Sequence, residues 1–319
     1  MRTVLRIFGL LFVLWTEISF AQPYPSRPIR LIVPFPPGGS NDIMARMAAT
    51  QLGERLGQQV VIENKGGAGG VLGTDIAAKS PPDGYTLLLI SVAYAFGPAL
   101  YRSLPYDPET AFAPVTILGR GPSALTVHPS LPVSSVQDLI ALAKAKPGAL
   151  NYASAGIGSF QHLSCALFMI QAGVDVVHIP YKGGGPAMAD VIAGQAQIVM
   201  PSLIQVVPHI KSGRLKVLGT SGTKRTAILP EVPTISETLP GYESHNWWGV
   251  LAPAGTPQPV IDRLYAAMSE VLLSRETSKR METEGAEAVR MTPAEFGRFI
   301  SAELAKWSKV AREVGIKAE

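Results

Sequence analysis

Cysteine is nearly absent from this 319-residue chain, which contains only Cys165. A single thiol cannot form an internal disulfide bond, even in an oxidising compartment. Its neighbours Leu163, Ala166 and Leu167 are apolar and indicate the buried face of a helix. We therefore interpret Cys165 as a core residue and not as a nucleophile.

The motifs of common catalytic and cofactor sites are also missing. The chain has no Gly-x-Ser-x-Gly elbow, no phosphate-binding P-loop and no His-Glu-x-x-His segment. Its five histidines are scattered, with no pair at metal-ligand spacing on one helix. Gly156 and Gly158 lack the third glycine of a dinucleotide site. We expect no catalysis, no cofactor and no metal; an enzyme without a recognisable nucleophile and base is the alternative.

Long apolar runs are scarce as well. The first residues contain one, at 7–15, which is about half the roughly 20 residues of a membrane-spanning helix. Arg2 and Arg6 flank this run, and a small-residue site ending at Ala21 follows it. The pattern predicts a cleaved signal peptide over residues 1–21 and a soluble, periplasmic mature protein. An uncleaved N-terminal anchor is the alternative.

Charge of one sign is not concentrated anywhere in the chain. The net charge is +4, and no run of basic residues occurs. This distribution argues against a nucleic-acid partner. The remaining residues, 22–319, are too many for one minimal core and fit two compact lobes of roughly 100 to 200 residues each.

Short apolar runs alternate with longer amphipathic stretches, which is typical of an α/β chain whose parallel strands are connected by helices. Three runs predict one doubly wound half, and four later runs predict a second parallel sheet: 29–33, 60–63 and 86–90, then 150–153, 176–179, 197–199 and 215–218. Extended pieces at 115–118 and 124–127, joined by 119–122, indicate where the chain leaves the first half. We expect lobe 1 to comprise 22–122 and 247–319, and lobe 2 to comprise 123–246.

Capping residues predict where several helices begin. Ser40, Asn41 and Asp42 offer capping oxygens for a helix that runs to about residue 57. Thr256 and Pro257 predict a capping threonine with proline at the first helical position. Residues 135–138 and 292–295 have the spacing of capping boxes.

In each half of the chain a glycine-rich loop meets a predicted helix start, at residues 38–42 and 155–159. A helix start carries unsatisfied N–H groups and a partial positive charge, and glycine lets a ligand approach them closely. Such loops lie at the carboxyl ends of strands, where ligands bind in doubly wound sheets. Each loop alone is also ordinary turn chemistry, but the pair predicts an anion site in a cleft.

Four side chains near these loops are candidates for ligand contact, and three of them have a second, structural interpretation. Asp42 either stabilises the first turn of its helix or contacts a ligand through water. His162 either donates to an anion or packs in the core. Tyr181 offers an aromatic wall with a hydroxyl, and Lys182 is either a counter-charge or a solvated surface residue.

Several long motifs follow one another in a distinctive order. They are Val33-Pro34-Phe35-Pro36-Pro37-Gly38-Gly39 with Asp42 and Arg46, Gly158-Ser159 with His162-Leu163, and residues 24–29, 61–70, 82–87, 152–156, 180–183 and 252–257. In this order they resemble the Bug receptors, the tripartite tricarboxylate transporter receptor family, over essentially all of the mature chain.

The resemblance implies a type II periplasmic-binding-protein fold, in which two doubly wound lobes close on a small organic acid, a carboxylate or dicarboxylate. It implies membrane subunits of a tripartite tricarboxylate transporter as partners, with a sensor kinase as the alternative, and a monomer. In such receptors ordered waters bridge the ligand to the first loop, near Asp42. The residues expected at the ligand are Phe35, Gly38, Gly39, Ser40, Asp42, Ser91, Gly156, Gly158, Ser159, His162, Tyr181, Gln197 and Pro201.

The sequence departs from the family pattern at Gln197 and Pro201, where that pattern has two acidic residues, and at Ala166, where it has a glutamate. An ammonium group on a ligand would lose its acidic partner there. The resemblance therefore predicts an organic acid without an α-amine. We expect the lobes to hinge near 119–123 and 245–249.

Overall fold

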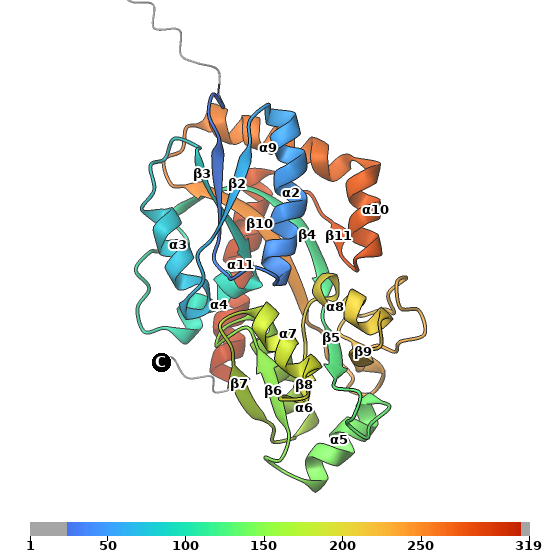
Figure 1. Ribbon diagram of the computed structural model, residues 1–319. Helices are drawn as coiled ribbons and strands as arrows, with labels where there is room; N and C mark the ends of the chain where they lie inside the picture. The colour runs from blue at the N-terminus through green and yellow to red at the C-terminus, as the bar shows by residue number, and fades with distance from the viewer. Residues whose placement is uncertain (1–23, 314–319) are drawn as a thin grey trace, which may run out of the picture.

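The computed structural model describes residues 24–313, and the predicted signal peptide lies outside the described residues. The chain forms two sheets that lie one above the other in Figure 1. The six-stranded sheet has the order β11-β4-β10-β3-β1-β2 and comprises β1 (Ile29–Val33), β2 (Val60–Asn64), β3 (Thr86–Ser91), β4 (Phe112–Pro122), β10 (His245–Pro253) and β11 (Glu287–Ala288). The five-stranded sheet has the order β7-β6-β8-β5-β9 and comprises β5 (Ala124–Val127), β6 (Asn151–Ser154), β7 (Val177–Pro180), β8 (Ile198–Val199) and β9 (Lys216–Thr220).

Both sheets are mixed, so the prediction of parallel sheets was wrong in part. β1 is parallel to β2 and β3, and β6 is parallel to β7 and β8. By contrast, β10 is antiparallel to β3 and β4, and β5 is antiparallel to β8 and β9. β4 carries the chain out of the first sheet and β10 brings it back beside β4, so these two strands must run in opposite directions.

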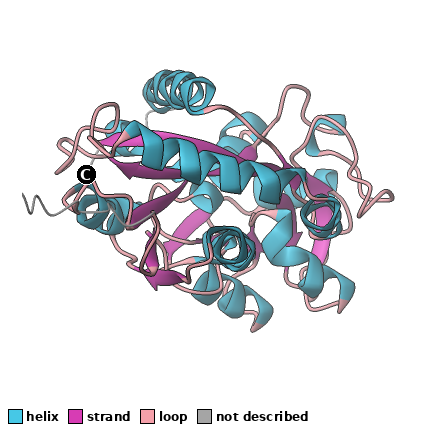
Figure 2. Ribbon diagram, turned by 90° about the horizontal axis from the view of Figure 1, so that it is seen from above, coloured by secondary structure: helices cyan, strands magenta, loops and turns pink. Residues whose placement is uncertain are grey.

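Helices cover both faces of the six-stranded sheet, as the view from above shows (Figure 2). They are α2 (Ser40–Leu56), α3 (Val71–Ala78), α4 (Val92–Leu100), α9 (Gln258–Leu273), α10 (Arg275–Thr283) and α11 (Pro293–Glu313). Side chains alternate along a strand, so Leu87 and Leu89 pack in one core cluster with α2 and α9. Leu88 and Ile90 pack in the other, with α4 and α11. The buried strand β3 therefore has an apolar residue at almost every position.

The five-stranded sheet is covered by α5 (Val136–Ala145), α6 (Phe160–Ala172), α7 (Gly184–Ile192) and α8 (Leu203–Lys211). Cys165 is fully buried in the core cluster that includes Tyr152, Phe168 and Ile198. Burial raises the pKa of this thiol. The prediction of a core cysteine is therefore confirmed. Among the described residues, no helix combines the length and the apolar character that a membrane span requires.

Two of the predicted helix starts differ from the expectation. Thr256 donates its hydroxyl hydrogen to the Pro253 carbonyl, and Pro257 is the residue before α9, so the threonine does not cap that helix. α2 begins after Gly39 without a side-chain cap. The capping box before α11 is confirmed: Thr292 Oγ1 accepts from the Glu295 N–H at 3.3 Å, and Glu295 accepts from the Thr292 N–H at 2.8 Å.

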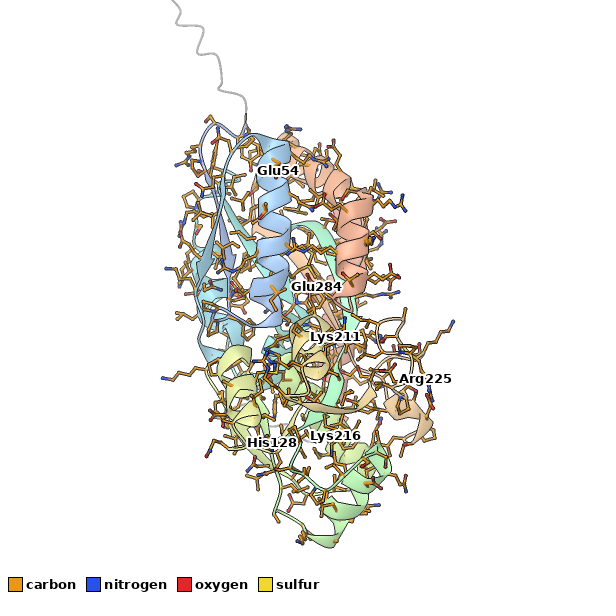
Figure 3. All side chains as sticks on the ribbon, turned by 45° about the vertical axis from the view of Figure 1, so that its right-hand side comes forward. Glu54, His128, Lys211, Lys216, Arg225 and Glu284 are labelled. Carbon is orange, nitrogen blue, oxygen red and sulfur yellow. The ribbon has the colours of Figure 1, made fainter. Side chains whose placement is uncertain are left out.

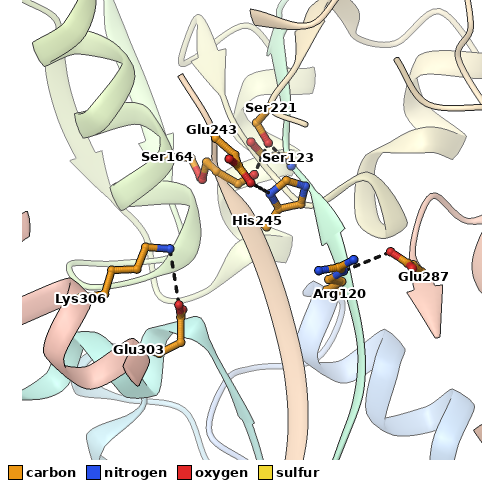
Figure 4. Close-up of polar contacts among 10 residues, drawn as sticks. Arg120, Ser123, Ser164, Ser221, Glu243, His245, Glu287, Glu303 and Lys306 are labelled. Atoms are coloured by element: carbon orange, nitrogen blue, oxygen red, sulfur yellow. Dashed lines mark hydrogen bonds and ion pairs between the residues drawn. The ribbon is translucent and has the colours of Figure 1, made fainter. Parts of the chain in front are cut away.

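The chain crosses between the sheets at Ser123, between β4 and β5, and at Ser244, before β10. These two residues and Ser164 and Ser221 are joined by hydrogen bonds, and we call the four the serine cluster; Ser123, Ser164 and Ser221 are labelled in Figure 4. The Ser123 N–H donates to Ser221 Oγ at 2.7 Å, and the hydroxyls of Ser164 and Ser244 lie 2.7 Å apart. Residues 119–122 continue β4 instead of leaving the sheet, so the expected start of the crossing was too early. The predicted lobe boundaries stay a prediction; below, the lobes are the two sheets with their helices.

Candidate functional site

A small cavity of about 30 Å³ lies between the lobes, at the point where five helices begin. The residue at the start of each helix lines it: Gly39 for α2, Ser91 for α4, Ser159 for α6, Gly184 for α7 and Ser202 for α8. Each helix start carries N–H groups without an intrahelical partner and roughly half a positive charge. The cavity is therefore an electropositive site built from backbone.

Side chains contribute no formal charge to this cavity, because none of its lining residues is acidic or basic. Ser159 caps α6 by accepting from the His162 N–H at 3.3 Å, whereas α2, α4, α7 and α8 have no side-chain cap. Backbone donors at these four starts can thus bind a ligand. Charged side chains such as Glu54, Lys216 and Arg225 lie elsewhere on the molecule (Figure 3).

Asp42 holds the first loop in place. Its carboxylate accepts from the Gly38 N–H at 3.1 Å, from Arg46 Nε at 2.9 Å and from Asn64 Nδ2 at 3.0 Å. Burial acts to raise the pKa of Asp42, but the bonds from Arg46, Gly38 and Asn64 outweigh it, and the pKa is lowered. Asp42 does not line the cavity. Its geometry favours a structural role over contact with a ligand.

Gly38 and Gly39 differ in their backbone conformation and in their surroundings. Gly38 has a φ of +82°, in the left-handed region that favours glycine. Gly39 has a φ of −85°, which other residues adopt without strain. A Cβ on Gly39 would lie 3.9 Å from the Gly184 nitrogen of the other lobe. A Cβ there would be in ordinary contact with α7, and only a larger side chain would enter the space between α2 and α7.

His162 packs beside the second loop and does not line the cavity. Its Nδ1 accepts from the Gly158 N–H at 3.2 Å, and its ring stacks on His178, with centroids 4.4 Å apart. His178 stacks in turn on Tyr152 at 4.7 Å. Burial lowers the pKa of His162 to about 4, so the ring is neutral near pH 7. These contacts favour the packing interpretation.

The glycines of the second loop contact the opposite lobe or the neighbouring loop. A Cβ on Gly158 would lie 2.6 Å from Leu100 Cδ1 on α4, and one on Gly156 would lie 3.2 Å from the Tyr181 carbonyl oxygen. Both have positive φ values, +77° and +113°. This loop is therefore shaped to fit against the first lobe.

Tyr181 and Lys182 do not line the cavity either. The Tyr181 hydroxyl faces Asp190 on α7, and burial together with that carboxylate raises the pKa of Tyr181. Lys182 is exposed. The structure does not bring the expected aromatic wall into the cavity; Phe35 and Phe160 line it instead.

Gln197 lies at the wrong end of its strand for ligand contact. It precedes β8, and its Oε1 accepts from the N–H of Asn151, the first residue of the parallel strand β6. The loop at residues 155–159 leaves the opposite end of β6. Pro201 is buried and its carbonyl accepts from the Ala124 N–H at 3.0 Å, while its neighbour Ser202 reaches the cavity. Neither position brings a side chain to the cavity.

Sequence reasoning missed four amide side chains that line the cavity: Asn41, Gln161, Gln205 and Asn246. Asn246 Nδ2 donates to Ser202 Oγ at 3.1 Å and lies 3.5 Å from Ser40 Oγ, so it bridges the lobes. Gln161 Nε2 donates to Gln205 Oε1 at 3.2 Å. The one available signal was Gln205, a polar residue inside the apolar stretch of α8.

A second hollow, of about 730 Å³, lies against the other face of β10. Side chains alternate along a strand, so Asn246 points to the cavity while His245 and Trp247 point to this hollow. Four Lys or Arg side chains and four Glu side chains line it. Arg120 pairs with Glu287 at 3.1 Å, Lys306 with Glu303 at 3.5 Å, and His245 with Glu243 at 3.1 Å (Figure 4). Although it is far larger, its basic and acidic side chains are equal in number, and several of them are already paired.

Metal binding has no support in residues 24–313, where no group of three or more His, Cys, Asp or Glu side chains could hold an ion. Because the cavity lining is uncharged, its polar groups are the backbone N–H groups, the four amides and the hydroxyls of Ser40, Ser91, Ser159 and Ser202. Such a lining can bind an anion with an apolar body.

Comparisons with known proteins show one family and several solved structures that this chain resembles. The model of one family, the tripartite tricarboxylate transporter family receptor, matches residues 44–316. Protein BugT of Bordetella pertussis is 41% identical over 300 residues, covering 93% of this chain and 92% of that protein. MatC from Rhodopseudomonas palustris with bound malate is 31% identical, with a TM-score of 0.86, and covers 90% of this chain and all of its own. R. palustris Rpa4515 with adipate is 37% identical, with a TM-score of 0.89, and covers 92% of this chain and 98% of its own.

Proposed function

The chain belongs to the tripartite tricarboxylate transporter receptor family, and from that premise we propose that it captures a small organic acid between its lobes. The observation that carries the proposal is the meeting of five helix N-termini at a cavity lined without charged side chains. Oriented N–H groups and helix dipoles favour an anion, and no carboxylate in the lining opposes it.

A carboxylate on an organic body fits this lining better than an inorganic anion. Phe35 and Phe160 line the same cavity and supply apolar surface for carbon atoms. Two similar proteins have structures with malate and with adipate. These relatives support a carboxylic acid as the ligand of this chain.

Capture requires the lobes to part and close again. Glycines sit where the lobes touch: a Cβ on Gly69 would lie 2.6 Å from the Ile157 carbonyl oxygen, and one on Gly183 would lie 2.8 Å from Pro36 Cγ. The cavity of about 30 Å³ has room for only one or two waters in this closed arrangement. The ligand therefore enters an opened form, and its contacts with both lobes favour closure.

The receptor acts in the periplasm after removal of residues 1–21 and hands its ligand to membrane subunits of a tripartite tricarboxylate transporter. Presentation of the ligand to a sensor kinase is the second candidate, because the same closed surface would serve it. A receptor releases its ligand unaltered. Recovery of a chemically changed acid after incubation with the protein would favour an enzyme instead.

The test is a thermal-shift screen of organic acids. The protein is first unfolded and then refolded, because this treatment removes any co-purified ligand. A ligand at 100 times its Kd adds about 2.7 kcal/mol to the free energy of unfolding. The corresponding primary alcohols serve as matched controls without the carboxylate, and we expect them to give no shift. If no acid raises the melting temperature above its alcohol, the proposed function is wrong.

A further inference from the structure

Two amide side chains in the cavity have polar atoms without a partner. Gln161 Oε1 and Gln205 Nε2 are buried and make no hydrogen bond, although the two residues are joined by their other amide atoms at 3.2 Å. Gln161 is 4% exposed and Gln205 is 6% exposed. A buried amide atom without a partner is costly, so this pair is poised for a group that is brought to it.

The amide pair belongs to the cavity on geometric grounds. Gln161 lies in the first turn of α6 and Gln205 in the first turn of α8, and both line the cavity. A Cβ on Gly184, at the start of α7, would lie 3.0 Å from the Nε2 atoms of both. The pair thus covers the N-terminus of α7.

The unpartnered atoms are always one donor and one acceptor. When one amide N–H donates to the other amide oxygen, an oxygen of the first and a nitrogen of the second stay free. Turning both amides over exchanges their roles and leaves the same balance. The complement is therefore a ligand group that both accepts and donates a hydrogen bond.

Charged groups meet this requirement poorly. A carboxylate only accepts, so it would face the free acceptor oxygen, and an ammonium group only donates. The other lining amides are already bonded: Asn41 Oδ1 accepts from Trp248 Nε1 at 3.0 Å, and Asn246 bonds to Ser202. The helix N-termini are engaged by the first carboxylate, and the lining has no charged side chain that would compensate a second ion at the amide pair.

Resting on the proposed function, we propose that the amide pair selects a monocarboxylate whose second polar group is uncharged and both donates and accepts, namely a primary carboxamide or a hydroxyl. The helix N-termini bind the carboxylate, and Gln161 and Gln205 bind the second group. The pair therefore acts as a specificity determinant against dicarboxylates and amino acids.

Calorimetric titration of the refolded protein with matched ligands tests this. The series pairs succinate with succinamate, glutarate with glutaramate and adipate with adipamate, and adds the unsubstituted monocarboxylate and the terminal hydroxy acid of each length. At the best chain length we expect the amide or the hydroxy acid to bind about tenfold more tightly than the dicarboxylate. Whichever of these two is tighter identifies the second group.

Variants separate selection from general binding. The double variant carries Gln161→Leu and Gln205→Leu. In it, the ratio of the affinity for the amide to the affinity for the unsubstituted monocarboxylate should fall at least tenfold, while the monocarboxylate still binds. Gln171→Leu is the matched control, because Gln171 lies exposed on the same helix α6. If the pair of substitutions prevents folding, the ligand series on the wild-type protein decides alone.

The outcomes distinguish the two proposals. Tighter binding of the dicarboxylate at every chain length, or selectivity unchanged in the double variant, overturns the role of the amide pair and leaves organic-acid capture standing. Absence of binding by every acid and amide in the series refutes organic-acid capture and this inference with it.

Discussion

The cavity and the hollow lie on opposite faces of β10 and are built in contrasting ways. The cavity is small, contains no charged side chain and collects five helix N-termini. The hollow is more than twenty times larger, and it contains acidic and basic side chains, two pairs of which form ion pairs with each other. Size alone would have favoured the hollow over the cavity.

The difference shows how backbone can recognise an anion without a basic residue. Dipoles fixed by a helix need no reorganisation when the ligand arrives, and they carry no countercharge that must first be displaced. In the hollow, by contrast, Lys306 must break its ion pair with Glu303 before it can bind an anion. The predictions below separate the two faces by changing one at a time.

The largest effect is expected for Gly39→Val. Its φ of −85° accepts a side chain, but the branched methyl groups would enter the narrow gap to Gly184 and hinder closure. Ligand affinity should fall about 100-fold, or about 2.7 kcal/mol, in a folded protein. Ala227→Val, on the exposed loop that lines the hollow, is the control and should leave affinity unchanged. Affinity within twofold of wild type in Gly39→Val would remove the first loop from the site.

The next effect is a loss of stability on acidification, caused by the stacked rings of His162 and His178, which we call the histidine stack. Burial lowers the pKa of His162 and of His178 to about 4, and the neighbouring His162 adds to the shift at His178. Between pH 6.5 and pH 4 the unfolded state binds more protons, so stability is full above pH 6.5 and falls as the pH drops. Because both rings are partly exposed, we reduce the expected effect: the free energy of unfolding should be about 2 kcal/mol lower at pH 5 than at pH 7.

The stack can be tested by substitution. Denaturant unfolding of His162→Asn should show a smaller pH dependence between pH 4 and pH 6.5 than wild type. His128→Asn is the matched control, because His128 lies outside the stack and bonds to Ser130. If the free energy of unfolding depends equally on pH in wild type and in His162→Asn, this loss of stability does not come from the histidine stack.

A smaller effect on affinity is expected when a negative charge is added to the cavity. In Ser202→Asp the new carboxylate can cap α8, which has no side-chain cap, and accept from Asn246, so the fold should tolerate it. The ligand carboxylate would then meet a like charge, and affinity should fall about tenfold, or about 1.4 kcal/mol. Thr223→Asp adds the same charge at the hollow and should leave affinity within twofold; an equal loss in both variants would contradict the contrast between the two faces.

Much of the fold was predictable because its signals are local. Apolar runs gave the strands at residues 29–33 and 86–90 to within one residue, and the spacing of Thr292 and Glu295 gave the start of α11. The direction of β10 could not be predicted, because strand pairing depends on where the chain re-enters the sheet and not on any residue in the strand.

The site was predictable only where backbone builds it. Glycine before a helix pointed to Gly39, and the structure places it at the cavity, while its contact with a ligand stays a prediction. Gln161 and Gln205 are 44 residues apart and meet only through the packing of α6 and α8. Gln197 was chosen by resemblance, but the two-residue strand β8 places it at the other end of the sheet.

The smallest effect should come from Glu303→Gln in the hollow, and it should fall on stability alone. Glu303 Oε2 accepts from the indole N–H groups of Trp247 and Trp307, each at 2.9 Å, and its side chain is only 12% exposed. Glutamine keeps one acceptor oxygen but loses the charge that strengthens both bonds, so the free energy of unfolding should fall by about 1 kcal/mol. Glu282→Gln, at an exposed residue of the same hollow, should change stability by less than about 0.5 kcal/mol. Ligand affinity should stay within twofold in both variants, because neither side chain contributes to the cavity on the other face of β10. A clear loss of affinity in Glu303→Gln would mean that the hollow is coupled to ligand capture through β10.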